Sequence, residues 1–136
     1  MTTPTTPARV LLDTSVIIDL DRIELGELAS ARPLVSSVSV AELAYALGTT
    51  DLVERHARVE RYHAALRRID VLPFDTAAAK LYGVLATLVR ETGRKSVPRR
   101  VDLQIAATAA ARSLPLLTRN PKDFAALHRL IRVIPI

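Results

Sequence analysis

Four polar side chains stand where apolar segments of this chain give way to helical ones. Asp13 and Asn120 each follow an apolar run, and Glu42 and Asp102 each lie near the start of a segment with helical spacing. If the apolar runs are parallel strands, their carboxyl ends share one edge of the sheet. Carboxylates gathered there would repel one another, and a hard divalent cation would relieve that repulsion. The spacing therefore predicts a site for Mg²⁺, or for Mn²⁺ as a substitute.

Each of these residues also has a purely structural explanation. Asp13 and Asn120 can act as N-caps of the helices that follow them. Ser39 and Glu42 have the three-residue spacing of a capping box, in which the glutamate bonds the cap amide. Asp102 would interact favourably with the dipole of its own helix. These explanations agree with the metal hypothesis on location, and only the convergence of the acids favours chemistry.

The remaining polar residues narrow the choice of site. Asp75 opens a helical segment as Asp102 does, but no neighbouring residue indicates chemistry, so we assign Asp75 to capping alone. His56 and His63 lie in a polar helical stretch and His128 lies near the end of the chain. The chain has no cysteine, which argues against a structural zinc site and a disulfide framework.

Short apolar runs alternate with longer helical patterns along the chain, which predicts a parallel sheet with helices on both faces. A short helix is also expected at 16–20 and another after Asn120, because Pro121 suits a first helical position. The expected strands are 10–12, 34–38, 69–72, 116–118 and 132–134, and the longer helices are 39–47, 51–68, 75–91 and 102–112.

Length and composition predict one domain. The chain has 136 residues, of which 49% are hydrophobic, enough for a core without disulfides. We expect a flexible arm at 1–8 and a single domain at 9–136, in a soluble, cytoplasmic protein without a membrane partner. The net charge of +5 is compatible with a polyanionic partner such as RNA, although charge alone decides little.

Four segments in order, LLDTSVII, SVAEL, DLQIAATA and LLTRNPKDF, carry a family resemblance. Over 10–136 the chain resembles the PIN-domain nucleases, and among them the VapC-type toxins of bacterial toxin–antitoxin systems. The resemblance implies an α/β fold, a three-layer α/β/α sandwich with a central parallel sheet, and a Mg²⁺-dependent endoribonuclease. It makes Asp13 and Asp102 metal ligands, with Glu42 a further candidate. Many members carry aspartate at Asn120, and Asp123 is a less favoured source of the missing charge.

The resemblance also implies a mechanism, in which water positioned by Glu42 or Asn120 attacks an RNA phosphate polarised by the metal. Three hydroxyl residues could orient the carboxylates or simply cap helices: Thr14, Ser15 and Thr118. The cations expected to bind RNA are Arg99, Arg100, Arg119 and Lys122, in segments that also contain Arg94 and Lys95. The segment 90–100 is expected to be a loop. Aromatic residues make up only 4% of the chain, so base stacking is not expected to dominate recognition.

The expected partners are RNA, a VapB-like antitoxin and a second copy of the chain. The antitoxin tail would lie in a groove near the acids and offer an arginine to them. Residues 23–30 and 40–47 could form that groove, a homodimer face or simply core. An alternative is a PIN-like module that binds RNA or protein without cutting, which Asn120 favours. A phospho-acceptor receiver domain is discounted, because no strand end in the middle of the chain supplies an acceptor aspartate.

Overall fold

Five parallel strands form the centre of the molecule. The computed structural model describes residues 6–136, so residues 1–5 of the predicted arm lie outside the described residues. The sheet order is β3-β2-β1-β4-β5, and every neighbouring pair is parallel. The prediction of five parallel strands is confirmed. The strands are β1 (Arg9–Leu12), β2 (Arg32–Ser36), β3 (Asp70–Leu72), β4 (Leu116–Thr118) and β5 (Val133–Pro135).

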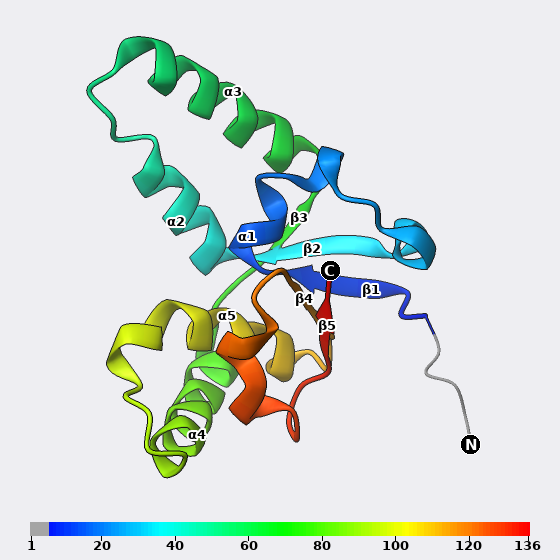
Figure 1. The fold of residues 1–136 in the computed structure, drawn as a ribbon, viewed down its shortest axis with the longest axis vertical. Coiled ribbons are helices and arrows are strands. Elements are labelled where there is room, and N and C mark those ends of the chain that lie inside the picture. The colour runs from blue at the N-terminus through cyan, green and yellow to red at the C-terminus, as the bar shows by residue number, and fades with distance from the viewer. Residues whose placement is uncertain (1–5) are drawn as a thin grey trace.

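Helices cover both faces of this sheet, so the α/β/α sandwich is confirmed. In Figure 1, α4, α5 and the 3-10 segment η4 lie below the sheet, while α1 and the arm of α2 and α3 lie above it. The helices are α1 (Thr14–Ile17), α2 (Ser37–Ala46), α3 (Leu52–Arg68), α4 (Thr76–Glu91) and α5 (Arg100–Ala111). The 3-10 segments are η1 (Leu20–Arg22), η2 (Gly26–Ser30), η3 (Val97–Arg99) and η4 (Pro121–Leu127).

Alternating side chains of the strands build two separate cores. Leu11 packs with buried residues of α4, α5 and η4 on one face of the sheet. Val10 and Leu12 pack on the other face with α1, and partly buried residues of α2 and α3 complete that core. Because successive side chains of a strand point to opposite faces, β1 contributes to both cores. The central strand is thereby fixed from both sides, and so is the residue that follows it, Asp13.

The junction between β2 and α2 differs from its prediction. The predicted strand 34–38 ends at Ser36, and α2 begins at Ser37. The side chain of Ser36 accepts a hydrogen bond from the Val38 amide, so Ser36 is the N-cap. Ser39 is therefore an interior residue of α2, and the predicted capping box is wrong. The junction contains Ser36, Ser37 and Ser39. The sequence pattern predicted the cap at Ser39, three residues after the observed N-cap.

Other boundaries shift by smaller amounts. The helix predicted at 102–112 begins at Arg100, because η3, with Pro98 in its first turn, leads directly into α5. The segment 90–100, predicted as a loop, begins with the last two residues of α4, contains η3 and ends at the first residue of α5. The helix expected at 16–20 is α1, which begins at Thr14. Across residues 6–136, no helix combines the length and the apolar character needed to cross a membrane.

Candidate active site

Asp13 lies at the carboxyl end of β1 and is 95% buried, with a relative exposure of 5%. Its Oδ1 accepts a hydrogen bond from the amide of Thr14 at 2.9 Å, as an N-cap of α1. Its Oδ2 accepts from the hydroxyls of Ser15 at 3.0 Å and of Thr118 at 2.8 Å. A buried carboxylate needs such donors, because burial without them is costly. Both readings of Asp13 therefore agree with the geometry: it caps α1, and its carboxylate is held in one orientation.

Glu42 lies on the first turns of α2 and faces α1. The Thr14 hydroxyl donates to Glu42 Oε1 at 2.6 Å and is hydrogen-bonded to the buried hydroxyl of Ser39 at 2.9 Å. Ser39 and Glu42 lie three residues apart and so share one face of the helix. The spacing that suggests a capping box thus produces a hydrogen-bonded triad with Thr14 instead. Ser39 is a functional candidate that sequence reasoning placed in the wrong role.

Asp102 lies in the first turn of α5 and is half-buried. Desolvation by burial, followed by the nearby charges of Asp13, Asp123 and Glu42, raises the pKa of its carboxyl from 3.8 to about 6, against an opposing effect of Arg99. The three acids from β1, α2 and α5 are therefore close enough to interact electrostatically. These electrostatic interactions agree with the prediction that the three residues lie near one another.

Helix α5 is tied to the sheet below the acids. The hydroxyls of Ser36, at the end of β2, and Thr108, in α5, are both buried and lie 2.9 Å apart. The Thr108 hydroxyl also donates to the Gln104 carbonyl. Because a buried hydroxyl pair is short and directional, it fixes α5 at one height against β2. No sequence motif pointed to Thr108, which lies in a run of alanines.

Asn120 and Asp123 follow β4 on the same edge. The Asn120 amide donates to the Thr118 hydroxyl at 3.0 Å, while the Asn120 side chain makes no cap bond to η4. The prediction that Asn120 caps this helix is therefore wrong, although the predicted helix exists as a 3-10 segment. Asp123 forms an ion pair with Arg99 at 3.2 Å. The carboxamide of Asn120 stays free of helix capping, at the exposed rim of the site.

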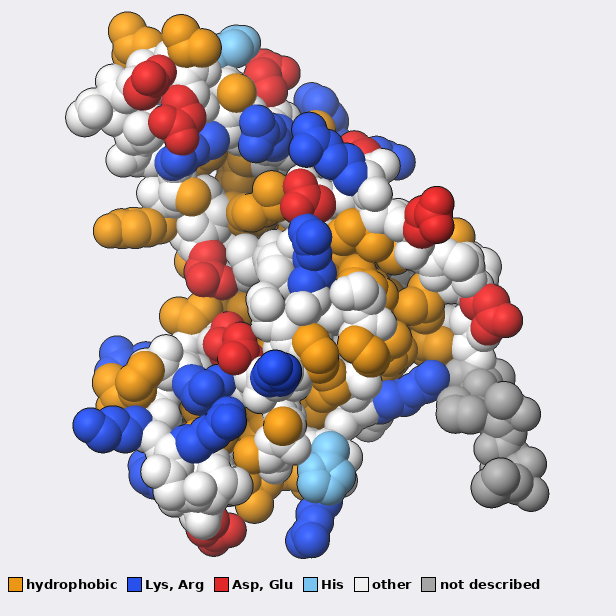
Figure 2. All heavy atoms as spheres, viewed as in Figure 1, with side chains coloured by type: hydrophobic (Ala, Val, Ile, Leu, Met, Phe, Trp, Pro, Cys, Tyr) orange, Lys and Arg blue, Asp and Glu red, His pale blue; other side chains and the backbone are white. Residues whose placement is uncertain are grey.

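The predicted RNA-binding cations divide into held and free side chains. Arg99 pairs with Asp123, and Arg119 pairs with Asp19 at 2.7 Å. Arg100 and Lys122 are exposed. Figure 2 shows acidic side chains in the hollow between the arm of α2 and α3 and the lobe of α4 and α5, with lysine and arginine side chains gathered on that lobe. Positive charge therefore lies beside the acids on this face.

The donor set fits a hard divalent cation by its chemistry. Asp13, Glu42 and Asp102 offer only oxygen ligands, and the charges of Asp13 and Glu42 contribute, after burial, to the raised pKa of Asp102. Within residues 6–136, however, no group of three or more Asp, Glu, His or Cys side chains is arranged so that it could hold a metal ion. A ready-made three-carboxylate cage is thus absent from the described part of the chain, and the fit rests on a smaller set of ligands with water.

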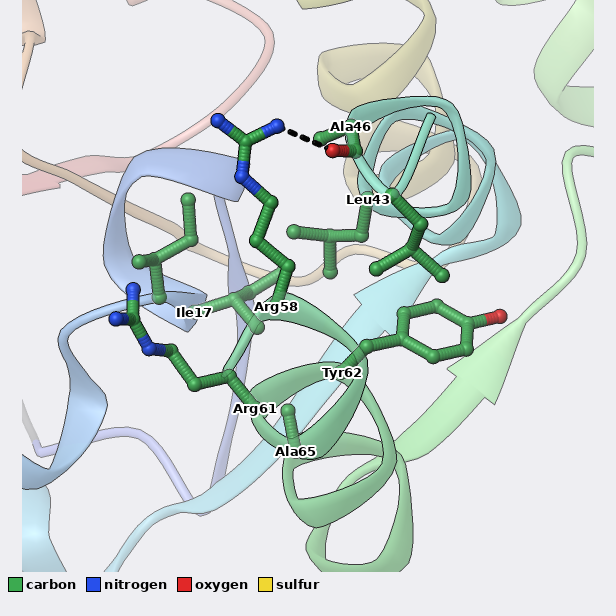
Figure 3. Close-up of a pocket in the computed structure, with 9 residues that line it drawn as sticks. Ile17, Leu43, Ala46, Arg58, Arg61, Tyr62 and Ala65 are labelled. Carbon is green, nitrogen blue, oxygen red and sulfur yellow. Dashed lines mark hydrogen bonds between the residues drawn. The ribbon is translucent and has the colours of Figure 1, made fainter. Parts of the chain in front are cut away.

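An apolar groove of about 280 Å³ lies beside the site, between α1, α2 and α3. Figure 3 shows Ile17, Leu43 and Tyr62 lining it, with Arg58 and Arg61 extending from α3. Arg58 donates to the Ala46 carbonyl at the end of α2. The predicted groove segment 40–47 contributes to it, but segment 23–30 does not and lines a different cavity, under η1 and η2.

Comparison with known proteins places this geometry in a family. The model of the PIN domain matches residues 10–130. The chain is 40% identical to Ribonuclease VapC5 of Mycobacterium tuberculosis over 90% of both chains. It is 34% identical to the tRNA(fMet)-specific endonuclease VapC of Shigella flexneri, over 66% of this chain and 65% of that one.

A solved structure agrees. The crystal structure of VapBC-5 from Mycobacterium tuberculosis, a member of the VapBC family of toxin–antitoxin systems, contains a chain with a TM-score of 0.77 and 32% identity. The match covers 96% of this chain and 100% of that one. The chain belongs to the PIN-domain family and, within it, to the VapC type. The resemblance carried by its four sequence motifs is confirmed.

Proposed function

We propose that this chain is a Mg²⁺-dependent endoribonuclease and the toxin of a type II toxin–antitoxin system. The observation that carries the proposal is the convergence of Asp13, Glu42 and Asp102, from three separate elements, where burial and then the charges of neighbouring acids raise the pKa of Asp102 to about 6. A phosphodiester is itself an anion, so these acids alone would repel it. The names of two relatives, a ribonuclease and a tRNA-specific endonuclease, support RNA as the substrate class.

Asp13 and Asp102 would hold the cation, with Glu42 as a further candidate ligand. Bound there, Mg²⁺ would lower the pKa of a bound water and neutralise charge that develops on the scissile phosphate. Mn²⁺ is the expected substitute, because it also prefers oxygen ligands. Ser15 and Thr118 hold the Asp13 carboxylate through their hydrogen bonds, so their role is to fix its direction.

Glu42 and Asn120 would position the attacking water. Thr14 holds Oε1 of Glu42, and within the described residues Oε2 has no hydrogen-bond partner. Oε2 is therefore free to accept the proton of water as it attacks phosphorus, in line with the leaving oxygen. The Asn120 carboxamide can hold the same water or a phosphate oxygen without adding charge. By family resemblance, the products carry a 5′-phosphate and a 3′-hydroxyl.

The cations of the lobe beside the acids would bind the RNA backbone. Arg100 and Lys122 are exposed there, and Arg119 is held by Asp19. Each phosphate that such a cation contacts releases condensed counterions, so binding should weaken steeply with salt. Because the chain has few aromatic residues, shape and backbone contacts are better supported than base stacking as the basis of recognition.

A VapB-like antitoxin would occupy the apolar groove. The groove begins at Ile17 and Leu43, next to the elements that carry Asp13 and Glu42, so a bound tail could reach the acids. The structurally similar protein of Mycobacterium tuberculosis is described as a member of the VapBC family of toxin–antitoxin systems. Arg61 lines the groove and has no partner within residues 6–136, which suits an acidic group on the tail. Tyr45, Leu52 and Val53 are exposed on α2 and α3 and are candidates for the expected homodimer face.

Cleavage of structured RNA tests the proposal. Purified protein is incubated with transfer RNA in Mg²⁺ and in EDTA, alongside an Asp13→Asn variant whose folding is checked by thermal melting. We expect cleavage in Mg²⁺ that EDTA and the substitution abolish. Cleavage that survives both would contradict the metal hypothesis. Tight RNA binding without cleavage by the wild type would favour the non-catalytic module, the alternative that Asn120 suggests.

A further inference from the structure

One ion pair joins the two segments on either side of Asp102. Arg99 ends η3 immediately before α5, and Asp123 lies in the first turn of η4. The two residues are 24 positions apart in the sequence, and their side chains meet at 3.2 Å. Both charges act on the Asp102 carboxyl, Asp123 disfavouring its ionised form and Arg99 favouring it. The pair therefore lies at the edge of the acidic site and not elsewhere on the surface.

The way in which Arg99 is held leaves most of its donors available. Its Nη1 donates to Oδ1 of Asp123 at 3.2 Å and to the Asp123 backbone carbonyl at 3.4 Å. Within residues 6–136, its Nε and Nη2 have no hydrogen-bond partner. The guanidinium carries five N–H donors in a rigid fork that matches two phosphate oxygens. Anchored by one nitrogen, Arg99 still presents an unpaired edge.

Burial separates Arg99 from the other cations beside the site. Its side chain is 26% exposed, whereas that of Arg119, the other held cation, is 46% exposed. Arg100 and Lys122 are exposed and make no ion pair within the described residues. A side chain already fixed in place loses less conformational entropy when it binds a phosphate. Arg99 is thus the best prepared of the four expected RNA-binding cations.

We propose that Asp123 is a positioning residue, which holds Arg99 so that its free edge binds the RNA phosphate next to the scissile one. This inference rests on the proposed ribonuclease function and names the two residues through which the protein would bind the RNA backbone. It also replaces the weaker expectation that Asp123 is a metal ligand, since Oδ1 of Asp123 is bound to Arg99 and its side chain is 41% exposed. Asp13, by contrast, is 5% exposed and has its carboxylate fixed by hydroxyls.

The chain supplies a matched control at the opposite end of α5. Arg112 and Asp75 also pair at 3.2 Å, with side chains 27% and 43% exposed, against 26% and 41% for Arg99 and Asp123. Arg112 is the C-cap of α5 and Asp75 the N-cap of α4. The two pairs therefore match in chemistry, distance and exposure, and they differ in their distance from the acids. Breaking the control pair reports the structural cost alone.

The experiment uses unfractionated transfer RNA as the probe and two measurements. Binding is measured by filter retention in EDTA over a range of salt concentrations, and cleavage kinetics are measured in Mg²⁺. The variants are Arg99→Ala, Asp123→Asn, Asp123→Glu and the double variant Arg99→Ala/Asp123→Asn, with Arg112→Ala and Asp75→Asn as controls.

Arg99→Ala should raise KM about tenfold with kcat within about twofold, and lower the salt slope of binding by about one. Asp123→Asn should raise KM about threefold without changing the Mg²⁺ concentration for half-maximal rate, because Arg99 loses its anchor but not its charge. The double variant should be no worse than Arg99→Ala, since Asp123 acts only through Arg99. Asp123→Glu should restore part of the loss, and both controls should behave as the wild type.

Two results would overturn the inference. If Asp123→Asn raises the Mg²⁺ requirement while RNA binding in EDTA is unchanged, Asp123 is a ligand and not a positioning residue. If Arg99→Ala binds RNA as Arg112→Ala does, Arg99 does not grip the substrate. A wild-type protein that binds RNA but never cleaves it would refute the proposed function instead, and the binding measurements in EDTA would still decide the role of the pair.

Discussion

Asp75, the N-cap of α4, and Asp102, in the first turn of α5, both lie at the start of a helix, yet the two acids behave in opposite ways. Asp75 caps α4, where its Oδ1 accepts from the Ala78 amide and its Oδ2 pairs with Arg112. These contacts, the backbone hydrogen bond first, hold the pKa of Asp75 below its ordinary value. Asp102 lies in the first turn of α5 without a capping bond, and burial and neighbouring acids raise its pKa to about 6. An aspartate at the start of a helix therefore has a lowered pKa in α4 and a raised pKa in α5.

The difference separates an acid used for structure from one available for chemistry. Asp75 has all the partners that a carboxylate needs, so the fold gains from its charge. The charge of Asp102 costs the fold free energy, because burial removes water from the carboxylate and other acids lie near it. A residue whose ionised form is destabilised by its surroundings is a candidate for function. A divalent cation bound at Asp102 would stabilise its ionised carboxylate and so offset this loss of folding free energy.

Exchanging each aspartate for asparagine gives the largest expected contrast. Asp102→Asn should reduce RNA cleavage at least about a thousandfold, because the proposed metal ligand is lost and the transition state loses several kcal/mol. Asp75→Asn should stay within about twofold, since asparagine caps a helix as well as aspartate does. The measurement is the initial rate in Mg²⁺ with both variants shown to be folded. Equal losses in the two variants would remove the distinction.

Thr118→Val should give an intermediate effect. The hydroxyl of Thr118 donates to Asp13 and accepts from the Asn120 amide, so valine removes both bonds at nearly constant volume. Loss of a group that orients a metal ligand typically costs about 10- to 100-fold in metal affinity or activity. The loss is measured as the change in the Mg²⁺ concentration that gives half of the maximal cleavage rate, and in that maximal rate.

Thr87→Val is the matched control for this substitution, because the Thr87 hydroxyl bonds the Gly83 carbonyl on the exposed side of α4. Its Mg²⁺ requirement should be that of the wild type. A Thr118→Val protein with the same Mg²⁺ requirement as Thr87→Val would show that Asp13 needs no orientation by Thr118.

The smallest expected difference between Asp75 and Asp102 lies in how each contributes to the pH dependence of the free energy of unfolding. A raised pKa in the folded state means that the stability linked to Asp102 is complete below about pH 4 and is lost as pH rises through about 6. A lowered pKa means that the contribution of Asp75 is present above pH 3.8 and is lost as pH falls below it. Urea unfolding in EDTA should therefore show a flatter curve between pH 4 and 6 for Asp102→Asn, and below pH 4 for Asp75→Asn. Identical curves for both variants would contradict this assignment.

Much of the fold could be predicted because it is encoded locally. The run that becomes β1 is apolar on both sides, as a strand covered by helices on both faces requires. The cap of α4 by Asp75 was predicted because its pattern lies within four residues. Asp13 and Glu42 could be placed at one edge because parallel strands share their carboxyl ends, whereas Asp102 follows α4 and η3 and was grouped with them by the family resemblance.

The remainder depends on contacts that no local pattern encodes. The spacing of Ser39 and Glu42 fits both a capping box and two neighbours on one helix face, and only the position of Thr14 decides between them. Asn120 precedes a proline as a cap would, but in the structure its side chain makes no cap bond to η4. The pairing of Arg99 with Asp123 spans 24 residues and arises only when η3 and η4 meet beside α5.

The titration of the Asp102 carboxyl, followed by carbon-13 NMR with and without Mg²⁺, tests most directly whether the acids share a cation. If the acids share a cation, the midpoint lies at about 6 in EDTA and well below that with saturating Mg²⁺, while Asp75 is unaffected. An Asp102 midpoint that Mg²⁺ leaves unchanged would show that Asp102 does not bind the cation.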